Sequence, residues 1–165
     1  MAELVVSFGN HFEEHEVIRA GIKQLADHLG DKFWQTAEER EKELDAPETR
    51  PMRDSTLRNL RWGLFYFLDG LKNHFDRDEE VVMPHVTAPQ KAELQRDHDA
   101  IRETLERAVS LVNRIVDGKL TGSDFERGCT ELSHAVHHLQ DLLEEHTREE
   151  DAILRTVGAG NGGHT

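Results

Sequence analysis

Polar residues interrupt four apolar stripes in this chain of 165 residues, and they do so in a regular pattern. Each stripe has the three-and-four spacing of an amphipathic helix, and each contains a histidine where an apolar residue is expected. Two stripes also contain a carboxylate one turn after the histidine. These residues are His15, His74, Asp78, His98, His146 and Glu150. Burying an unpartnered polar group costs several kcal/mol, so such groups on core-facing stripes need a shared partner.

Glycine and proline divide the stripes into four helices. Gly30 and Gly118 are natural C-terminal stops for the first and third helices. The expected helices run from Ser7 or Asn10 to Leu29, from Asp54 or Ser55 to just before Pro84, from Pro89 to Asp117, and from Ser123 to about Val157. Residues 31–53 are charged and contain prolines, which predicts a long loop or a short helix. The glycine-rich segment 158–165 predicts a flexible C-terminal tail.

These elements predict one all-α domain over residues 1–157, folded as an up-down-up-down antiparallel four-helix bundle. Sequential helices of such a bundle run in opposite directions. His15 and His98 lie near the starts of their helices, whereas His74 and His146 lie near the ends of theirs. The alternation therefore brings the four histidines to the same end of the bundle.

The donor types in this pattern favour a pair of metal ions. His74 with Asp78, and His146 with Glu150, share a helix face because they are four residues apart. Imidazole suits iron, zinc and copper, and a carboxylate spans two metals about 3.5–4 Å apart. Tetrahedral zinc would leave two carboxylates buried without a role. Two six-coordinate irons would keep roughly four positions open for other ligands, and reactivity would lie there.

Four segments resemble those of the hemerythrin-like HHE cation-binding domains. The segment HFDRDEEVVMP (residues 74–84) is similar to the family signature HFxxEExxLFP, and HTREEDAIL (146–154) repeats it. EEHEVIR (13–19) and RDHDAIR (96–102) resemble the two segments with an isolated histidine. The resemblance covers about residues 10–157. It implies a hemerythrin-like bundle in which the six residues named above hold two iron ions, oxo- or hydroxo-bridged, that meet dioxygen, peroxide or nitric oxide.

The two carboxylate positions leave alternatives. The family usually has glutamate where this chain has Asp78, and Glu79 is the neighbouring alternative. Oxygen-carrying hemerythrins use the fifth residue after the helix-four histidine, here Asp151, rather than Glu150. Asp78 and Glu150 are favoured because they lie on the stripes, whereas the next residue of a helix is rotated by about 100°.

A fifth histidine is the other open point. Oxygen carriers have a second histidine one turn into the third helix, where this chain has Arg102, and this argues against reversible oxygen carriage. His11, one turn before His15, is a candidate replacement, although fraying of the first helix would remove it. The ferritin-like di-iron class is a poor alternative because it needs Glu-x-x-His. None of the residues three before the four histidines is acidic, and they are Phe12, Leu71, Gln95 and Leu143.

Residues off the stripes are expected to have ordinary roles. Aromatic side chains of the second helix are expected in the core: Trp62, Phe65, Phe67 and Phe75. The remaining histidines are expected in solvent: His28, His85, His134, His137, His138 and His164.

Charge and composition exclude several classes of function. The net charge of -13 disfavours nucleic acid and anionic membrane as partners and favours cations. Acidic residues crowd the histidine end, where they would be solvated, attract iron, or accept hydrogen bonds from the N–H groups of ligand imidazoles. The single cysteine, Cys129, and the absence of a visible signal peptide predict a cytoplasmic protein.

The first functional expectation is a non-heme di-iron protein that binds or reacts with dioxygen or peroxide. The alternative is an iron- or oxygen-sensing module without turnover, and a lower-ranked one is repair of iron–sulfur centres damaged by nitric oxide. The sequence leaves open whether the protein is an enzyme, what its substrate or signal is, and which protein partner it has.

Overall fold

The computed structural model describes residues 2–29, 50–120 and 122–160. These residues form four long α-helices and one short 3-10 helix, and they contain no strand. The elements are α1 (Ala2–His28), α3 (Arg50–Val81), η1 (Met83–His85), α4 (Ala88–Val116) and α5 (Ser123–Gly160). The predicted all-α fold is confirmed.

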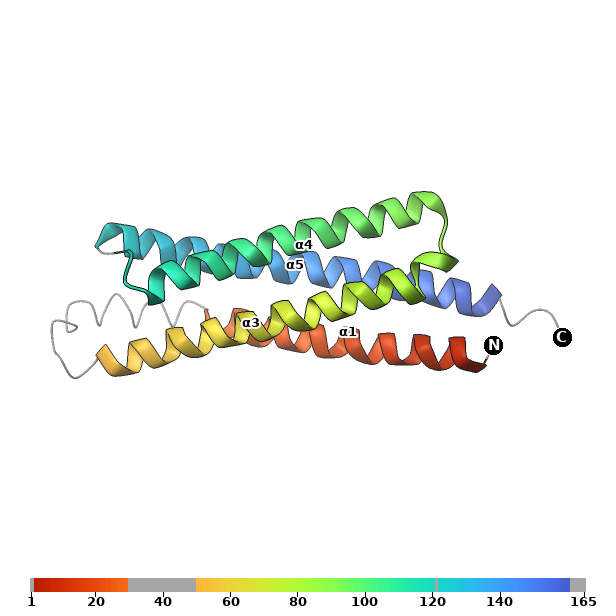
Figure 1. Ribbon diagram of the computed structural model, residues 1–165, viewed down its shortest axis with the longest axis horizontal. Coiled ribbons are helices and arrows are strands. Elements are labelled where there is room, and N and C mark those ends of the chain that lie inside the picture. Colours follow the sequence, from red (N-terminus) through yellow and green to blue (C-terminus); the bar gives the residue numbers. More distant parts are fainter. Residues whose placement is uncertain (1, 30–49, 121, 161–165) are drawn as a thin grey trace.

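The four long helices form an antiparallel bundle (Figure 1). Each helix packs against two neighbours, in the circular order α1, α3, α4, α5. Successive helices run in opposite directions, and α1 begins at the same end of the bundle where α5 ends. The up-down-up-down topology predicted from the positions of the histidines is therefore confirmed.

Gly118 ends α4 as the sequence predicts. Its φ of 69° lies in the left-handed region that favours glycine. The N–H of Gly118 donates to the carbonyl of Ile115 at 3.2 Å, and the N–H of Lys119 donates to Arg114 at 3.0 Å. This pair of hydrogen bonds is a Schellman motif, which satisfies the last carbonyls of the helix and turns the chain toward α5.

Two helices begin earlier than predicted. α1 begins at Ala2 rather than at Ser7 or Asn10, because no proline interrupts the helix-compatible residues before Ser7. α3 begins at Arg50 rather than at Asp54 or Ser55, and it contains Pro51 in its first turn. Proline is tolerated there because the first N–H groups of a helix have no intrahelical acceptor.

The remaining boundaries agree with prediction to within a few residues. α5 continues to Gly160, three residues into the segment expected as a tail. The rest of that segment, 161–165, and residues 31–49 of the expected loop or short helix lie outside the described residues. Within the described part, no helix is both long and apolar enough to cross a membrane.

The apolar core has two parts, and the polar residues lie between them. The larger part contains side chains from all four helices and occupies most of the bundle's length. The smaller part contains Val82, Met83, Leu94 and Leu154 at the end where η1 joins α3 to α4. Val82 and Leu154 lie one turn beyond Asp78 and Glu150, so this smaller cluster closes the polar layer from the outer end.

The prediction for the aromatic residues of α3 is partly wrong. Phe75 is buried and Phe67 is half-buried, but Trp62 is 56% exposed and Phe65 is 39% exposed. These two residues lie off the stripe that contains Leu60 and Leu64, so the helical period turns them outward. The off-stripe histidines whose side chains are described are exposed as predicted, namely His85, His134, His137 and His138; the side chains of His28 and His164 are outside the described set.

Candidate metal centre

The structure brings the six predicted residues together in one buried layer. None of their side chains is more than 3% exposed. They come from all four helices and are His15, His74, Asp78, His98, His146 and Glu150. His11 joins them and is completely buried.

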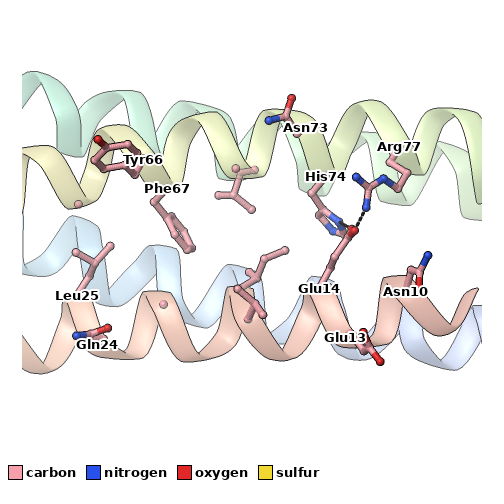
Figure 2. Close-up of a pocket in the computed structure, with 16 residues that line it drawn as sticks. Asn10, Glu13, Glu14, Gln24, Leu25, Tyr66, Phe67, Asn73, His74 and Arg77 are labelled. Atoms are coloured by element: carbon pink, nitrogen blue, oxygen red, sulfur yellow. Dashed lines mark ion pairs between the residues drawn. The ribbon is translucent and has the colours of Figure 1, made fainter. Parts of the chain in front are cut away.

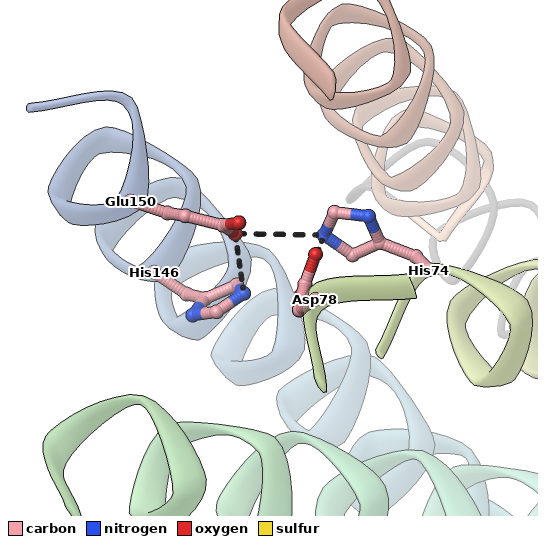
Figure 3. A group of neighbouring side chains, drawn as sticks. All are labelled: His74, Asp78, His146 and Glu150. Carbon is pink, nitrogen blue, oxygen red and sulfur yellow. Dashed lines mark ion pairs between the residues drawn. The ribbon is translucent and has the colours of Figure 1, made fainter. Parts of the chain in front are cut away.

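Helices α3 and α5 each contribute a histidine and a carboxylate one turn apart. Figure 3 shows the two pairs facing each other, with His74 and Asp78 on α3 opposite His146 and Glu150 on α5. Each of the four residues offers one donor atom, and these atoms all lie within 4.8 Å of one another. The i, i+4 spacing read from the sequence therefore places two nitrogen and two oxygen donors in one small volume.

Asp78 contacts three imidazoles through its two carboxylate oxygens. Its Oδ1 lies 2.8 Å from Nε2 of His11. Its Oδ2 lies 3.2 Å from Nε2 of His98 and 3.5 Å from Nε2 of His74. One carboxylate thus joins histidines from α1, α3 and α4.

Glu150 occupies the equivalent position on the other side of the layer. Its Oε2 lies 3.2 Å from Nε2 of His15, 3.5 Å from Nε2 of His146 and 3.8 Å from Nε2 of His74. Its Oε1 lies 4.0 Å from Nε2 of His11. Each carboxylate therefore has imidazole nitrogens near both of its oxygens.

The donor atoms fit a layer that encloses cations. Among the described residues, Nε2 of His15, His74, His98 and His146 has no hydrogen-bond partner, and neither oxygen of Glu150 has one. Buried polar atoms are normally paired, so a group of unpaired ones facing each other needs an explanation. Two ligands of one ion, each about 2.1 Å from it and at a right angle, lie about 3 Å apart. The 3.2–3.8 Å separations around Glu150 Oε2 are close to that arrangement.

The protonation states of His74 and Asp78 suit metal ligands, whereas His15 is shifted toward its protonated form in the metal-free layer. Burial lowers the pKa of His74 to about 3, despite the charge of Asp78, so its imidazole is neutral at neutral pH. Burial would raise the pKa of Asp78, but its contacts with His11 and His98 outweigh this and hold the pKa below its usual range. Burial would lower the pKa of His15, yet Glu150 and Asp151 outweigh it and raise that pKa. Neutral imidazole and ionised carboxylate are the forms that bind a cation.

Asp151 lies behind His15 rather than in the layer. Its Oδ1 is 2.6 Å from Nδ1 of His15, while Nε2 of that ring faces Glu150. Arg19 lies 3.5 Å from the other oxygen of Asp151 and also donates to Thr147 at 2.9 Å. A carboxylate that accepts the second N–H of an imidazole fixes its orientation and tautomer. The arrangement favours Glu150 over Asp151 as the donor to the layer.

Two other histidines also have a carboxylate on their outer side. Nδ1 of His74 lies 3.5 Å from Oε2 of Glu14, whose other oxygen forms an ion pair with Arg77. Nδ1 of His146 lies 3.9 Å from Oδ2 of Asp97. Some of the acidic residues that crowd this end are thus placed beside the imidazoles instead of pointing only into solvent.

His98 is held by stacking on one side of its ring, while its Nε2 faces Asp78. Its ring lies on the ring of Phe75, with the centroids 4.0 Å apart and the planes inclined by 26°. The guanidinium of Arg102 lies 5.0 Å from the centre of the same Phe75 ring. Arg102 occupies the position where oxygen carriers have another histidine, and here it packs against the outer side of Phe75.

His11 is the residue that sequence reasoning undervalued. α1 begins at Ala2, so His11 lies well inside the helix and the expected fraying does not reach it. Its spacing from His15 was the available signal, because residues four apart share a helix face. Glu79, the alternative to Asp78, is exposed and does not enter the layer.

Comparison with known proteins agrees with this geometry. The family described as the hemerythrin HHE cation-binding domain matches residues 10–157, which include all seven residues of the buried layer. No curated protein and no solved structure matches the chain. The sequence match covers most of the chain, and the bundle and its buried histidine–carboxylate layer are those of a cation-binding domain. The chain therefore belongs to the hemerythrin HHE cation-binding domain family.

Proposed function

We propose that this chain is a non-heme di-iron protein that binds or reacts with dioxygen or peroxide. The observation that carries the proposal is the donor set of the buried layer, which has five imidazoles and two carboxylates and no thiolate. Imidazole and carboxylate together suit iron, and two carboxylates among imidazoles from four helices provide more donors than one ion needs. Iron bound there would supply redox chemistry that protein side chains lack.

The residues of the layer would divide the binding between two ions. Asp78 contacts His11, His74 and His98, and Glu150 contacts His15, His74 and His146. Both carboxylates would provide negative charge to offset that of the cations. His15 and His74 would be oriented from outside, by Asp151 and Glu14 respectively.

The surrounding residues would control access to the layer. Leu94, Val82 and Leu154 close its outer end and would exclude bulk water. The acidic side chains Asp97 and Glu14 lie at its edge and would raise the local concentration of cations. Seven side-chain donors, even with both carboxylates bridging, leave about three positions free on two six-coordinate ions, so a small molecule has room to bind.

The test is to load the metal-free protein with iron(II) under anaerobic conditions and then to add dioxygen or hydrogen peroxide. We expect about two irons per chain. After mixing with either oxidant in a stopped-flow instrument, the near-ultraviolet absorbance should change within seconds. His138→Ala, an exposed residue of α5, is the matched control and should behave like the unaltered protein. A protein that holds two irons and shows no change with either oxidant would contradict the proposal.

The same experiment separates the other functions considered. A sensing module would gain thermal stability from iron but would consume neither dioxygen nor peroxide. A reaction only with nitric oxide would point instead to the nitric-oxide-related function.

A further inference from the structure

A groove between α1 and α3 leads along the bundle to the metal centre (Figure 2). Its volume is about 740 Å³, within the range of sites that bind small organic molecules. Apolar side chains and glycines form most of its lining, and His74 is the member of the buried layer that contributes to it. The groove therefore connects the solvent-facing side of the two helices with one edge of the layer.

Three glycines line the groove, and a side chain of the facing helix packs over two of them. A Cβ atom added at Gly21 would lie 3.2 Å from Phe67, and one added at Gly63 would lie 3.0 Å from Leu25. At these two points a side chain of one helix lies over a glycine of the other. A Cβ at Gly70 would meet nothing within 4 Å. Gly70 costs α3 roughly 0.5–1 kcal/mol relative to alanine, and no packing contact with residues 2–29, 50–120 or 122–160 requires it.

The end of the groove near the metal centre is polar and built from buried atoms. His74 is 3% exposed, and its Nδ1 has no hydrogen-bond partner in the part of the chain that the structure describes. Oε2 of Glu14 lies 3.5 Å away and also lacks one, while Arg77 pairs with the other oxygen of Glu14. In Figure 2 the side chains of His74 and Arg77 converge on Glu14, whereas Phe67 and Leu25 point into the space between the helices.

The outer edge of the groove exposes apolar surface. Val17 is 72% exposed and Tyr66 is 75% exposed, and both line the groove. Exposed apolar patches beside a concave site commonly mark where a ligand binds. Glu13 and Glu14 outnumber Arg77 in the lining, and the whole chain carries a net charge of -13, so an anionic ligand is disfavoured.

We infer that the α1–α3 groove binds a small, largely apolar organic molecule without negative charge and places one end of it beside His74. The apolar body lies along Phe67, Leu25 and the open surface at Gly70, and the end near Glu14 reaches the edge of the metal centre. This inference extends the proposed function, since it names the class of molecule that would share the site with dioxygen or peroxide.

The test uses two fluorescent probes that differ by one charged group. N-phenyl-1-naphthylamine is uncharged, and 8-anilino-1-naphthalenesulfonate is the same ring system with a sulfonate. We expect the uncharged probe to bind the metal-free protein in a saturable, one-to-one manner, and the anionic probe to bind about tenfold more weakly or worse. Equal binding of both probes, or no saturable binding of the uncharged one, would overturn the inference.

Gly70 offers a matched pair of variants. Gly70→Phe fills the open space and should weaken binding of N-phenyl-1-naphthylamine by about tenfold or more, whereas Gly70→Ala should bind it nearly as the unaltered protein does. Circular dichroism and metal content check that both variants are folded. Undiminished binding by folded Gly70→Phe contradicts the placement.

A labelling experiment on the unaltered protein decides the location should Gly70→Phe fail to fold. An uncharged phenyl diazirine, photolysed in the presence of the protein, should label residues 17–25 and 63–74, and excess N-phenyl-1-naphthylamine should suppress the labelling. Labelling confined to other segments would exclude the groove.

The link to the metal centre is measured separately. Proton relaxation of the bound uncharged probe should be faster in iron(II)-loaded protein than in zinc-loaded protein, because iron(II) is paramagnetic and zinc(II) is not. If the groove binds the probe but the protein takes up no iron, the inferred binding site is supported and the proposed function is refuted. Probe binding with equal relaxation in both metal forms would refute the placement beside His74.

Discussion

The two halves of this bundle bury different kinds of surface. In the half distant from η1, the facing positions are apolar, and residues such as Leu64, Ile101, Leu105 and Leu139 are at most 1% exposed. In the half nearer η1, the same helical faces carry histidines and carboxylates that are equally buried. Each of the four long helices is α-helical through both halves, while the residue types on the inward face change.

The comparison separates what folds this protein from what its function requires. Apolar side chains stabilise a bundle by their own burial, about 25 cal/mol for each Å² removed from water. Buried imidazoles and carboxylates without a cation cost free energy, because their desolvation is not repaid. The apolar half should therefore be stable without metal, whereas the polar half should depend on it.

The largest expected effect is loss of metal from the polar half alone. His74→Ala and His146→Ala should each lose most of the bound iron, since each removes a nitrogen donor from the quartet that lies within 4.8 Å. His137→Ala, an exposed residue of α5, should keep its iron. Elemental analysis by mass spectrometry gives the iron content per chain, and full retention by both site variants would break the distinction between the halves.

Removal of iron should destabilise one half more than the other. A cation present at about 1,000 times its dissociation constant adds roughly 4 kcal/mol to folding stability, so the metal-free protein should melt at a lower temperature. Hydrogen exchange should become faster at residues 73–83 and 94–99 and should change little at residues 101–112. Uniform acceleration along α4 would show instead that the bundle responds to metal as one unit.

Truncation in the apolar half should affect stability without affecting metal. Leu139→Ala removes a completely buried side chain and should lower the free energy of unfolding by about 2–5 kcal/mol in both the iron-loaded and the metal-free protein. Denaturant titration measures this, and the folded variant should keep its iron content. Iron loss comparable to that of His74→Ala would show that the halves are coupled.

Replacement of a buried histidine by an apolar residue should lower stability in both forms, and more with iron. In His98→Leu, Oδ2 of buried Asp78 loses an imidazole nitrogen that lies 3.2 Å away. We expect the metal-free variant to be less stable than metal-free unaltered protein by about 1–3 kcal/mol, because a buried carboxylate loses one of its partners, and the iron-loaded variant to lose more. Denaturant titration of both forms measures this, and a metal-free variant more stable than the unaltered protein would contradict it.

The smallest expected effect distinguishes two adjacent carboxylates of α3. Glu79 is exposed, so Glu79→Ala should leave iron content unchanged and stability within about 0.5 kcal/mol. Asp78→Ala should lose iron, because Asp78 contacts three histidines. Iron loss in Glu79→Ala and retention in Asp78→Ala would reverse the assignment.

The sequence predicted the polar half well because its pattern is local. A histidine and a carboxylate four residues apart on an apolar stripe lie on the same inward face of their helix. The alternation of helix direction determines their position along the length of the bundle. His11 was harder to place, because its burial depends on where α1 begins, and helix ends are weakly determined by local sequence. Glu14 and Asp97 lie off the stripes, so their positions beside imidazoles become visible only once the helices are packed.

The α1–α3 groove could not be predicted from periodicity. Gly21 and Gly63 lie on different helices, and the space beside them depends on how Phe67 and Leu25 interlock. The exposure of Trp62 followed from the helical period, but its aromatic character alone had favoured the core. Non-local packing decides the groove, whereas the helical period decides the exposure of Trp62.

The most direct test of the central claim is anomalous diffraction at the iron absorption edge, with crystals of the iron-loaded protein. We predict two anomalous peaks inside the polar layer, one among His11, Asp78 and His98 and the other among His15, His146 and Glu150, with His74 beside both. Peaks only at surface carboxylates, or an iron-free layer with its imidazoles turned to solvent, would contradict the account.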